Sequence, residues 1–286
     1  MLQSNRTPMF PMSLLRVPGS LGRAITYMSR VMARHRTVLI ATLFIELRKR
    51  YAGSTIGAAW LVLHPILLLS VYLFVFLVVF RVRFPGYSDF GYVLYVFTGL
   101  VPYLGLSEAI STGSLSIKAN AHLVRNVMLP IELIPVRTVA TSLAMQFAAL
   151  GVVIVLAAAG GELTPKIVAL PVVLVLQFLM VLGIVLAISA IAVFVQDIAY
   201  FINLALILLM FVSPIGFRPE MLPVEWHFLL WINPLHYMTD AFRFSLLASH
   251  QADPRALVGF GVLAVSLFAM GGALFLRLRS ALIDYE

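Results

Sequence analysis

The sequence predicts an all-α integral membrane protein with six transmembrane helices, and its composition and segment lengths are the observations behind this prediction. Hydrophobic residues make up 62% of the 286 residues, charged residues make up 11%, and the mean hydropathy is +1.01. Soluble domains are about half apolar and a quarter charged, so too little polar sequence remains here to cover a soluble core. Six segments reach the roughly 20 mostly apolar residues that a spanning helix needs: 58–80, 91–111, 136–158, 167–195, 198–217 and 256–276.

The distribution of positive charge predicts that both ends of the chain lie in the cytoplasm. With the N-terminus inside, 14 of the 20 Lys and Arg residues fall on cytoplasmic segments, as the positive-inside rule requires. No short apolar core with a cleavage site follows the basic N-terminal region, so we expect no signal peptide. The expected organisation is a cytoplasmic tail (1–34), an amphipathic helix with the motif that opens the first span (35–57), a single transmembrane domain (58–279) and a second cytoplasmic tail (280–286).

An amphipathic helix is predicted over residues 35–51, before the first span. Its apolar residues recur at the spacing of one helical face: Ile40, Leu43, Phe44, Leu47 and Tyr51. Its apolar run is too short to cross a bilayer, so we expect an N-terminal interfacial helix with its cationic end against lipid headgroups. The alternative is a helix that is simply buried.

The segment 219–247, between the fifth and sixth spans, is too apolar for a free loop and too interrupted by proline for a span. We expect short re-entrant helices on the outer side, because Trp and Tyr favour the membrane interface and non-helical backbone at that depth must be buried or line a wet cavity. The segment then lines or caps a pathway, and Asp240 pairs with Arg243 at the i, i+3 spacing. The candidate outer gate comprises Trp226, Trp231, Tyr237, Asp240 and Arg243.

Catalytic motifs are absent from the sequence. It contains no phosphate-binding loop, no zinc-protease motif, no nucleophile elbow and no cysteine, and its six histidines are scattered. We therefore expect no catalytic residue, metal or cofactor in this chain, and no nucleic-acid partner, because the net charge of +8 is explained by membrane topology. His64, inside the first span, is either a proton relay or a neutral imidazole bonded to a neighbouring helix.

A membrane pathway without its own energy source needs a partner that docks on a cytoplasmic surface. The loop from Ser116 to Arg137 carries polar and basic residues and is held by Pro130 and Pro135. It is either a rigid docking element or a plain solvated loop.

Four motifs, in order along the predicted topology, resemble those of ABC-2 class permeases that export polysaccharides. They are RKRYAGSTIGAAWLVLHP from Arg48, IKANAHLVRNVMLPIELIP from Ile117, VQDIAY from Val195, and SPIGFRPEMLP followed by WINPLHYMTDAFR. Two residues depart from the family pattern: Leu129 replaces an aromatic residue and Gln196 replaces an arginine. The resemblance covers residues 38–279.

The resemblance implies a homodimer in the bacterial inner membrane that binds two copies of a separate cytoplasmic ATPase, with Mg-ATP on that partner. By position, the helix that couples to the ATPase includes Ser116, Lys118, Asn120, His122, Arg125 and Asn126. The implied substrates are lipid-linked polysaccharides, namely O-antigens, capsules or teichoic acids, and periplasmic or outer-membrane export partners are compatible with this. The alternatives are a permease of the same architecture for a drug or lipid, and a stand-alone channel without an ATPase.

Two sets of residues are candidates for substrate contact. A headgroup gate is predicted at the start of the first span, because Arg binds phosphate bidentately and Lys supplies a point charge: Arg48, Lys49, Arg50, Tyr51, Gly53 and Ser54. The alternative is a positive-inside anchor. Aromatic rings that stack on sugars are predicted along a channel at the dimer axis, with core or lipid-facing packing as the alternative: Tyr72, Phe76, Tyr95, Phe97 and Tyr103.

Overall fold

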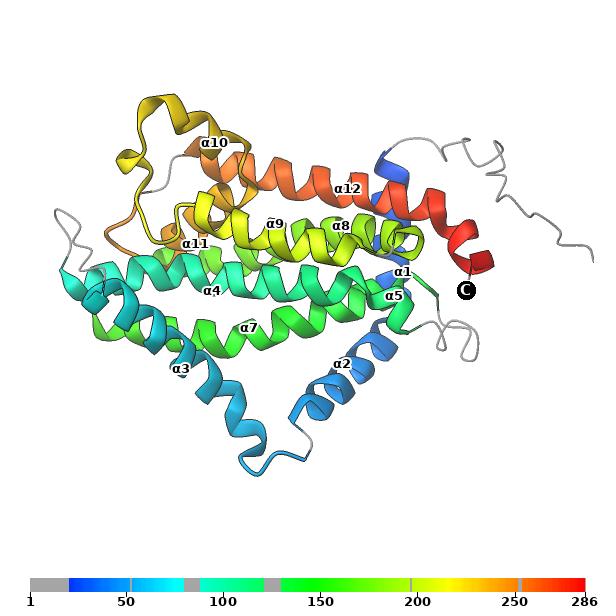
Figure 1. Cartoon of the computed structure of the whole chain (residues 1–286), viewed down its shortest axis with the longest axis horizontal. Helices are drawn as coiled ribbons and strands as arrows, with labels where there is room; N and C mark the ends of the chain where they lie inside the picture. The colour runs from blue at the N-terminus through cyan, green and yellow to red at the C-terminus, as the bar shows by residue number, and fades with distance from the viewer. Residues whose placement is uncertain are drawn as a thin grey trace, which may run out of the picture.

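A computed structural model describes residues 21–51, 53–79, 88–120, 130–195, 197–251 and 254–285. Over these ranges all regular structure is helical and no strand occurs, so the predicted all-α class is confirmed. The long helices run side by side and form an elongated bundle (Figure 1). Short helices gather at one end of it, and α1 and α5 lie at the other.

Four helices of the bundle are long and apolar enough to cross a membrane. They are α4 (Asp89–Ser114), α7 (Leu133–Ala159), α8 (Leu170–Phe194, preceded by a 3-10 turn over Pro165–Ala169) and α12 (Pro254–Tyr285). Each coincides with a predicted span, because length and apolarity are local properties of the sequence.

The other two predicted spans are shorter helices. α3 (Trp60–Leu73) continues into a π-helical stretch over Phe74–Val79, and α9 covers Ile198–Val212. α9 ends where it does because Ser213 precedes a proline, which disfavours the helical conformation, and Ser213 is extended. The predicted span 198–217 is therefore cut short by the segment that follows Val212.

Small residues bring the central helices into close contact. α8 and α12 touch where a Cβ atom added to Gly271 would lie 1.8 Å from the carbonyl oxygen of Gly183, as is common between membrane helices. α4 passes through the middle of the bundle, and Gly105 on it admits the side chain of Gln146 from α7. Gln146 and Gln177 of α8 exchange hydrogen bonds of 3.0 and 2.9 Å.

The amphipathic helix with a cross-bundle orientation is α1 (Leu21–Arg34), which the sequence analysis assigned to the N-terminal tail. It crosses the bundle at the end where α5 lies (Figure 1), and it buries Ala24 and Met28 beside Gly272 of α12. The helix predicted over 35–51 is α2 (Arg36–Tyr51), which forms a V with α3 whose apex lies away from the bundle. Ile40 and Phe44, expected on its apolar face, are exposed.

Candidate functional site

The segment Ser213–Phe217 is non-helical and lies at the end of the bundle where α10 (His227–Ile232) and α11 (Pro234–Leu246) gather. Ser213, Pro214 and Ile215 are buried, and Gly216 and Phe217 are half-buried. Backbone carbonyls that leave a helix inside a membrane need hydrogen-bond donors from the protein. The contacts of this segment therefore decide whether its conformation is stable.

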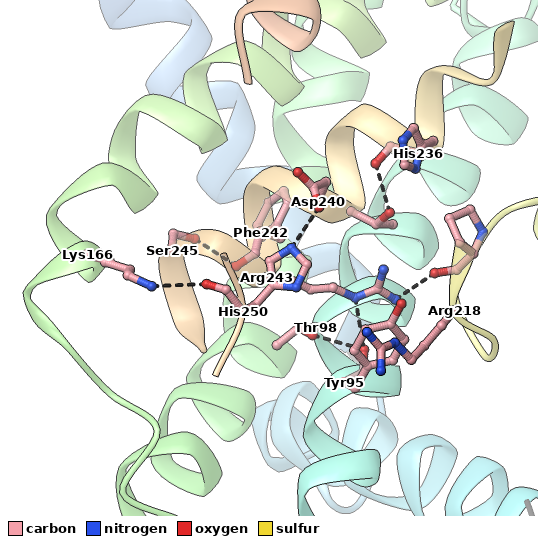
Figure 2. A network of polar contacts seen from close by, with 12 residues as sticks. Tyr95, Thr98, Lys166, Arg218, His236, Asp240, Phe242, Arg243, Ser245 and His250 are labelled. Carbon is pink, nitrogen blue, oxygen red and sulfur yellow. Dashed lines mark hydrogen bonds and ion pairs between the residues drawn. The ribbon is translucent and has the colours of Figure 1, made fainter. Parts of the chain in front are cut away.

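Arg243 of α11 supplies donors to the first two carbonyls after Ser213. Its Nη2 atom donates to Pro214 O at 2.6 Å and to Ile215 O at 3.2 Å, and its Nε atom donates to Tyr95 O at 3.4 Å. The guanidinium carbon lies 3.6 Å from the centre of the Tyr95 ring (Figure 2), a cation–π contact. Gly99 leaves room for it, because a Cβ atom there would lie 3.0 Å from Nη2.

Two tyrosines of α4 supply the next donors. The Tyr92 hydroxyl donates to Gly216 O at 3.2 Å, and the Tyr95 hydroxyl donates to Phe217 O at 3.3 Å. Each carbonyl from residue 214 to residue 217 thus accepts a side-chain hydrogen bond. We call this arrangement the carbonyl lock: residues 213–217 with Tyr92, Tyr95, Asn233 and Arg243.

Asn233 joins the same segment to the start of α11. Its Oδ1 atom accepts from Leu235 N at 2.9 Å and caps the helix, and its Nδ2 atom donates to Ser213 Oγ at 2.8 Å. Pro234, at the first helical position, fits this cap because its missing N–H needs no acceptor. The two motifs SPIGF and NPLHYMTDAFR therefore lie in contact and are joined by hydrogen bonds.

The structure gives Asp240 and Arg243 different partners from those predicted. Asp240 Oδ1 lies 2.7 Å from His250 Nε2, whereas Arg243 reaches toward α4 (Figure 2). Lys166 donates to the backbone oxygen of His250 at 3.0 Å and so extends the network on that side. The spacing was suitable for a pair, but each side chain is drawn to an acceptor or base on another element.

The predicted channel aromatics of α4 are buried within the single chain. Tyr95, Phe97 and Tyr103 are 2%, 3% and 4% exposed, and the Tyr103 hydroxyl donates to Leu206 O of α9 at 2.9 Å. Tyr72 is half-buried, with its hydroxyl 3.9 Å from Met210 Sδ. The side chain of Phe76 lies outside the described part. Tyr95, Phe97 and Tyr103 therefore pack between helices and do not line an open surface of the protomer.

Exposed aromatic side chains lie instead on α9, which the sequence analysis did not single out. Tyr200, Phe201 and Phe211 are 78%, 70% and 71% exposed, and Leu204 and Leu208 share their face of the helix. The signal was available in the sequence, since these positions recur at helical spacing.

The α2–α3 connection, residues 53–59, carries the motif predicted to gate headgroups. Arg48 and Lys49 are exposed on the last turns of α2, and Ser54 is exposed in the connection. Gly53 and Gly57 have φ values of +84° and +57°, which glycine adopts without strain. The side chains of Arg50 and Tyr51 lie outside the described part.

A cavity of about 680 Å³ lies beside this connection, between α3, α4 and α7. Ser54, Trp60, His64, Glu108 and Gln146 are among the residues that line it. His64 is exposed and is one of the residues that line this cavity. The structure thus brings two ionisable residues to one cavity, His64 of α3 and Glu108 of α4, and ionisable groups within membrane helices are functional candidates.

Part of the predicted coupling helix is seen in α5 (Ser116–Ala119). Ser116 is buried, Lys118 is half-buried, and Asn120 Oδ1 accepts from Arg137 Nη2 at 2.8 Å. His122, Arg125 and Asn126 lie outside the described residues. The described part of this segment is therefore held against α7.

A charged cluster missed by the sequence analysis lies near α5. Glu132, 0% exposed, accepts a 3.0 Å hydrogen bond from the Tyr27 hydroxyl of α1, and Arg279 Nε of α12 lies 2.9 Å from the same oxygen, Oε1. Burial raises the pKa of Tyr27, and the charge and hydrogen bond of Glu132 raise it further. This Glu132 cluster ties α1 and α12 to the start of α7. Over the described ranges, no group of three His, Asp or Glu side chains is placed to hold a metal ion.

Comparison with known proteins identifies a family and several relatives to which this chain is similar. A family model described as ABC-2 type transporter matches residues 37–247. The O-antigen export system permease protein RfbA of Myxococcus xanthus is 26% identical over 249 residues, which cover 86% of this chain and 94% of the relative. Two RfbA proteins of Klebsiella pneumoniae are each 26% identical over 201 residues, which cover 69% of this chain and 75% of each relative.

Proposed function

Because the chain belongs to the ABC-2 type transporter family, and is thus a membrane permease subunit and not an enzyme, we propose that it forms the channel of an exporter for lipid-linked polysaccharide. The observation that carries the proposal is the similarity to an O-antigen export permease over 94% of that relative's length. A shared subdomain alone would not extend so far. We assign the O-antigen or capsule class of substrate and the bacterial inner membrane on this basis.

In the proposed topology, α3 with its π-helical extension and α9 are the first and fifth of six spans, and the carbonyl lock lies on the periplasmic side. The Glu132 cluster and α5 then lie in the cytoplasm with both termini. The sequence has no cysteine, so single-cysteine variants test this directly. Ser249→Cys should react with an impermeant maleimide added to whole cells, and Lys118→Cys should react only after lysis. The reverse pattern would refute the orientation.

The working complex in this proposal is a homodimer with two copies of a cytoplasmic ATPase that binds Mg-ATP. The exposed aromatic face of α9 supports a pathway or subunit contact along that helix, since large exposed patches mark interaction sites, while lipid contact is the competing use of such a face. α5 and residues 120–126 are the proposed ATPase contact.

Co-purification tests the proposal most directly. The permease is expressed with any ABC ATPase encoded beside its gene, and the complex is assayed for bound subunit and for nucleotide hydrolysis. Cells lacking the permease should accumulate lipid-linked polysaccharide inside, and the wild-type gene should restore surface polymer. An adjacent ATPase with unchanged surface polymer would indicate a drug or lipid substrate, and purification without any nucleotide hydrolase would indicate a stand-alone channel.

A further inference from the structure

A cavity of about 250 Å³ lies where the turn Pro219–Met221, α10 and the start of α11 meet the start of α12. The residues that border it include two aromatic residues, two histidines and two acidic residues: Trp231, Tyr237, His227, His236, Glu220 and Asp240. Pockets for drug-sized ligands hold about 300–1,000 Å³, so this cavity is matched to a single small ring.

The two aromatic side chains are placed differently. The Tyr237 hydroxyl donates to Trp231 O at 2.8 Å, and the Tyr237 ring lies against α12, where a Cβ atom on Gly259 would come within 2.9 Å of it. Trp231 is 60% exposed. The Tyr237 ring is therefore held in place, whereas the Trp231 ring is accessible to a ligand. Aromatic rings of this kind combine an apolar surface with a polar tip, which suits a ligand with both C–H and hydroxyl groups.

The polar groups also favour an uncharged ligand. Asp240 lies 2.7 Å from His250, and Glu220 lies 3.2 Å from Arg218, so each carboxyl group already has a basic neighbour. Sugar hydroxyls donate and accept, which complements carboxylate and imidazole groups.

A second hollow, of about 660 Å³, shares Trp231 and Tyr237 with the first. Its border also includes Arg255 and Ser266. The aromatic pair thus stands between two neighbouring spaces, an arrangement that fits successive units of one polymer. We propose that the smaller cavity is a carbohydrate subsite that takes one neutral pyranose unit, with the next unit in the larger hollow. This rests on the proposed export function for its natural ligand.

A single-tryptophan variant tests the subsite on the purified full chain. The chain has three tryptophans, Trp60, Trp226 and Trp231, so Trp60→Phe with Trp226→Phe leaves Trp231 as the reporter. Methyl glycosides of glucose, galactose and mannose are titrated, with methyl glucosiduronate as the charged comparator. We expect a saturable change in Trp231 emission with at least one neutral glycoside, and binding of the uronate weaker by about tenfold, or 1.4 kcal/mol. The absence of any saturable change, or equal binding of the uronate, would overturn the proposal.

Matched alanine variants in the natural background locate the binding. Trp231→Ala removes the proposed platform, and Trp226→Ala removes a tryptophan of similar exposure, 54%, that borders neither hollow. Saturation-transfer NMR should show binding weakened by about tenfold in the first variant and by less than about twofold in the second, because only the first loses ring contact. Trp231→Phe should retain most of the binding. Equal losses in the two alanine variants would place the sugar elsewhere and refute the subsite.

These binding measurements need neither ATPase nor export. If sugar binding depends on Trp231 but no ATPase joins the chain, the export function fails and the subsite stands. If export is restored by the wild-type gene but no glycoside binds, the subsite fails and the export function stands.

Discussion

The carbonyl lock and the α2–α3 connection are both breaks between helices, but the structure supports them in opposite ways. In the lock, each carbonyl from residue 214 to residue 217 accepts a hydrogen bond from a side chain of α4 or α11, and Arg243 is 2% exposed. In the connection, the described hydrogen bonds, Gly57 N to Ser54 O and Ala59 N to Ile56 O, are local backbone contacts. A Cβ atom on Gly53 or Gly57 would meet nothing within 4 Å.

The difference separates a break that fixes structure from one that permits movement. Non-helical backbone is stable at membrane depth only where donors are supplied, and the lock supplies them from distant parts of the sequence. The connection has two glycines in the left-handed region and open space around them, which are features of low local stability. We therefore assign the lock to holding the fold, and we expect the connection to be the more loosely held of the two, so that substitutions should affect them unequally.

The largest effect is expected at Arg243. Arg243→Met should lower the free energy of unfolding by on the order of 4 kcal/mol, because two buried carbonyls lose their donor and each costs about 1–3 kcal/mol. Thermal unfolding in detergent, followed by tryptophan fluorescence, measures this change. The matched control is Arg34→Met on the exposed side of α1, expected within about 0.5 kcal/mol of wild type. Similar losses in the two variants would mean that the lock does not carry the fold.

A smaller loss is expected at Asn233, which holds the other side of the lock. Asn233→Ala removes the helix cap on Leu235 N and the donor to Ser213, and should cost about 1–2 kcal/mol. Asn203→Ala is the matched control, since Asn203 accepts a hydrogen bond from Ser111 at an exposed site. The same unfolding assay measures both variants. If Asn233→Ala leaves the free energy of unfolding unchanged, the contacts of Asn233 do not stabilise the lock.

Much of the fold was predictable because it depends on local properties. Apolar runs of sufficient length gave α4, α7, α8 and α12, and the prolines and aromatics of 219–247 predicted short helices there. α1 was assigned to the tail because its apolar residues are few, and Ala24 and Met28 become buried only against α12. Tertiary contacts of that kind leave no local signal.

The side-chain partners within the candidate site were not predictable from the sequence. The i, i+3 rule paired Asp240 with Arg243, whereas in the structure Asp240 lies beside His250 and Arg243 donates to Tyr95 O and Pro214 O. The rule considers one helix alone, whereas the acceptors of Arg243 lie on the segment after α9 and on α4. Glu132 was missed because nothing near it in sequence identifies Tyr27 or Arg279 as its partners. Hydrogen-bond partners that lie on different helices can be assigned only when the tertiary structure is known.

At the connection, a change of backbone should cost less than either change in the lock. Gly57→Ala forces a residue with a Cβ atom into φ +57°, at a cost of about 1 kcal/mol, with no clash to add to it. Gly261→Ala in α12 is the control, because it also meets open space but has no positive φ, and it should be neutral or slightly stabilising. If Gly57→Ala unfolds as readily as Arg243→Met, the connection is not the loosely held region described above.

The smallest effect on stability, and the sharpest test of the connection as a gate, is expected from its charges. Arg48→Gln, Lys49→Gln and Arg50→Gln together should change the free energy of unfolding by less than about 0.5 kcal/mol, because Arg48 and Lys49 are exposed. Surface polymer in complemented cells should nevertheless fall if these residues receive an anionic headgroup.

The control removes three exposed arginines from α1: Arg23→Gln, Arg30→Gln and Arg34→Gln. An anchoring role by positive charge alone predicts that both triple variants lose insertion together, whereas a headgroup role predicts loss of export only in the first, with membrane insertion and ATPase binding intact. Normal export in the first variant would leave the connection without a part in substrate capture, although the lock would stand unaffected.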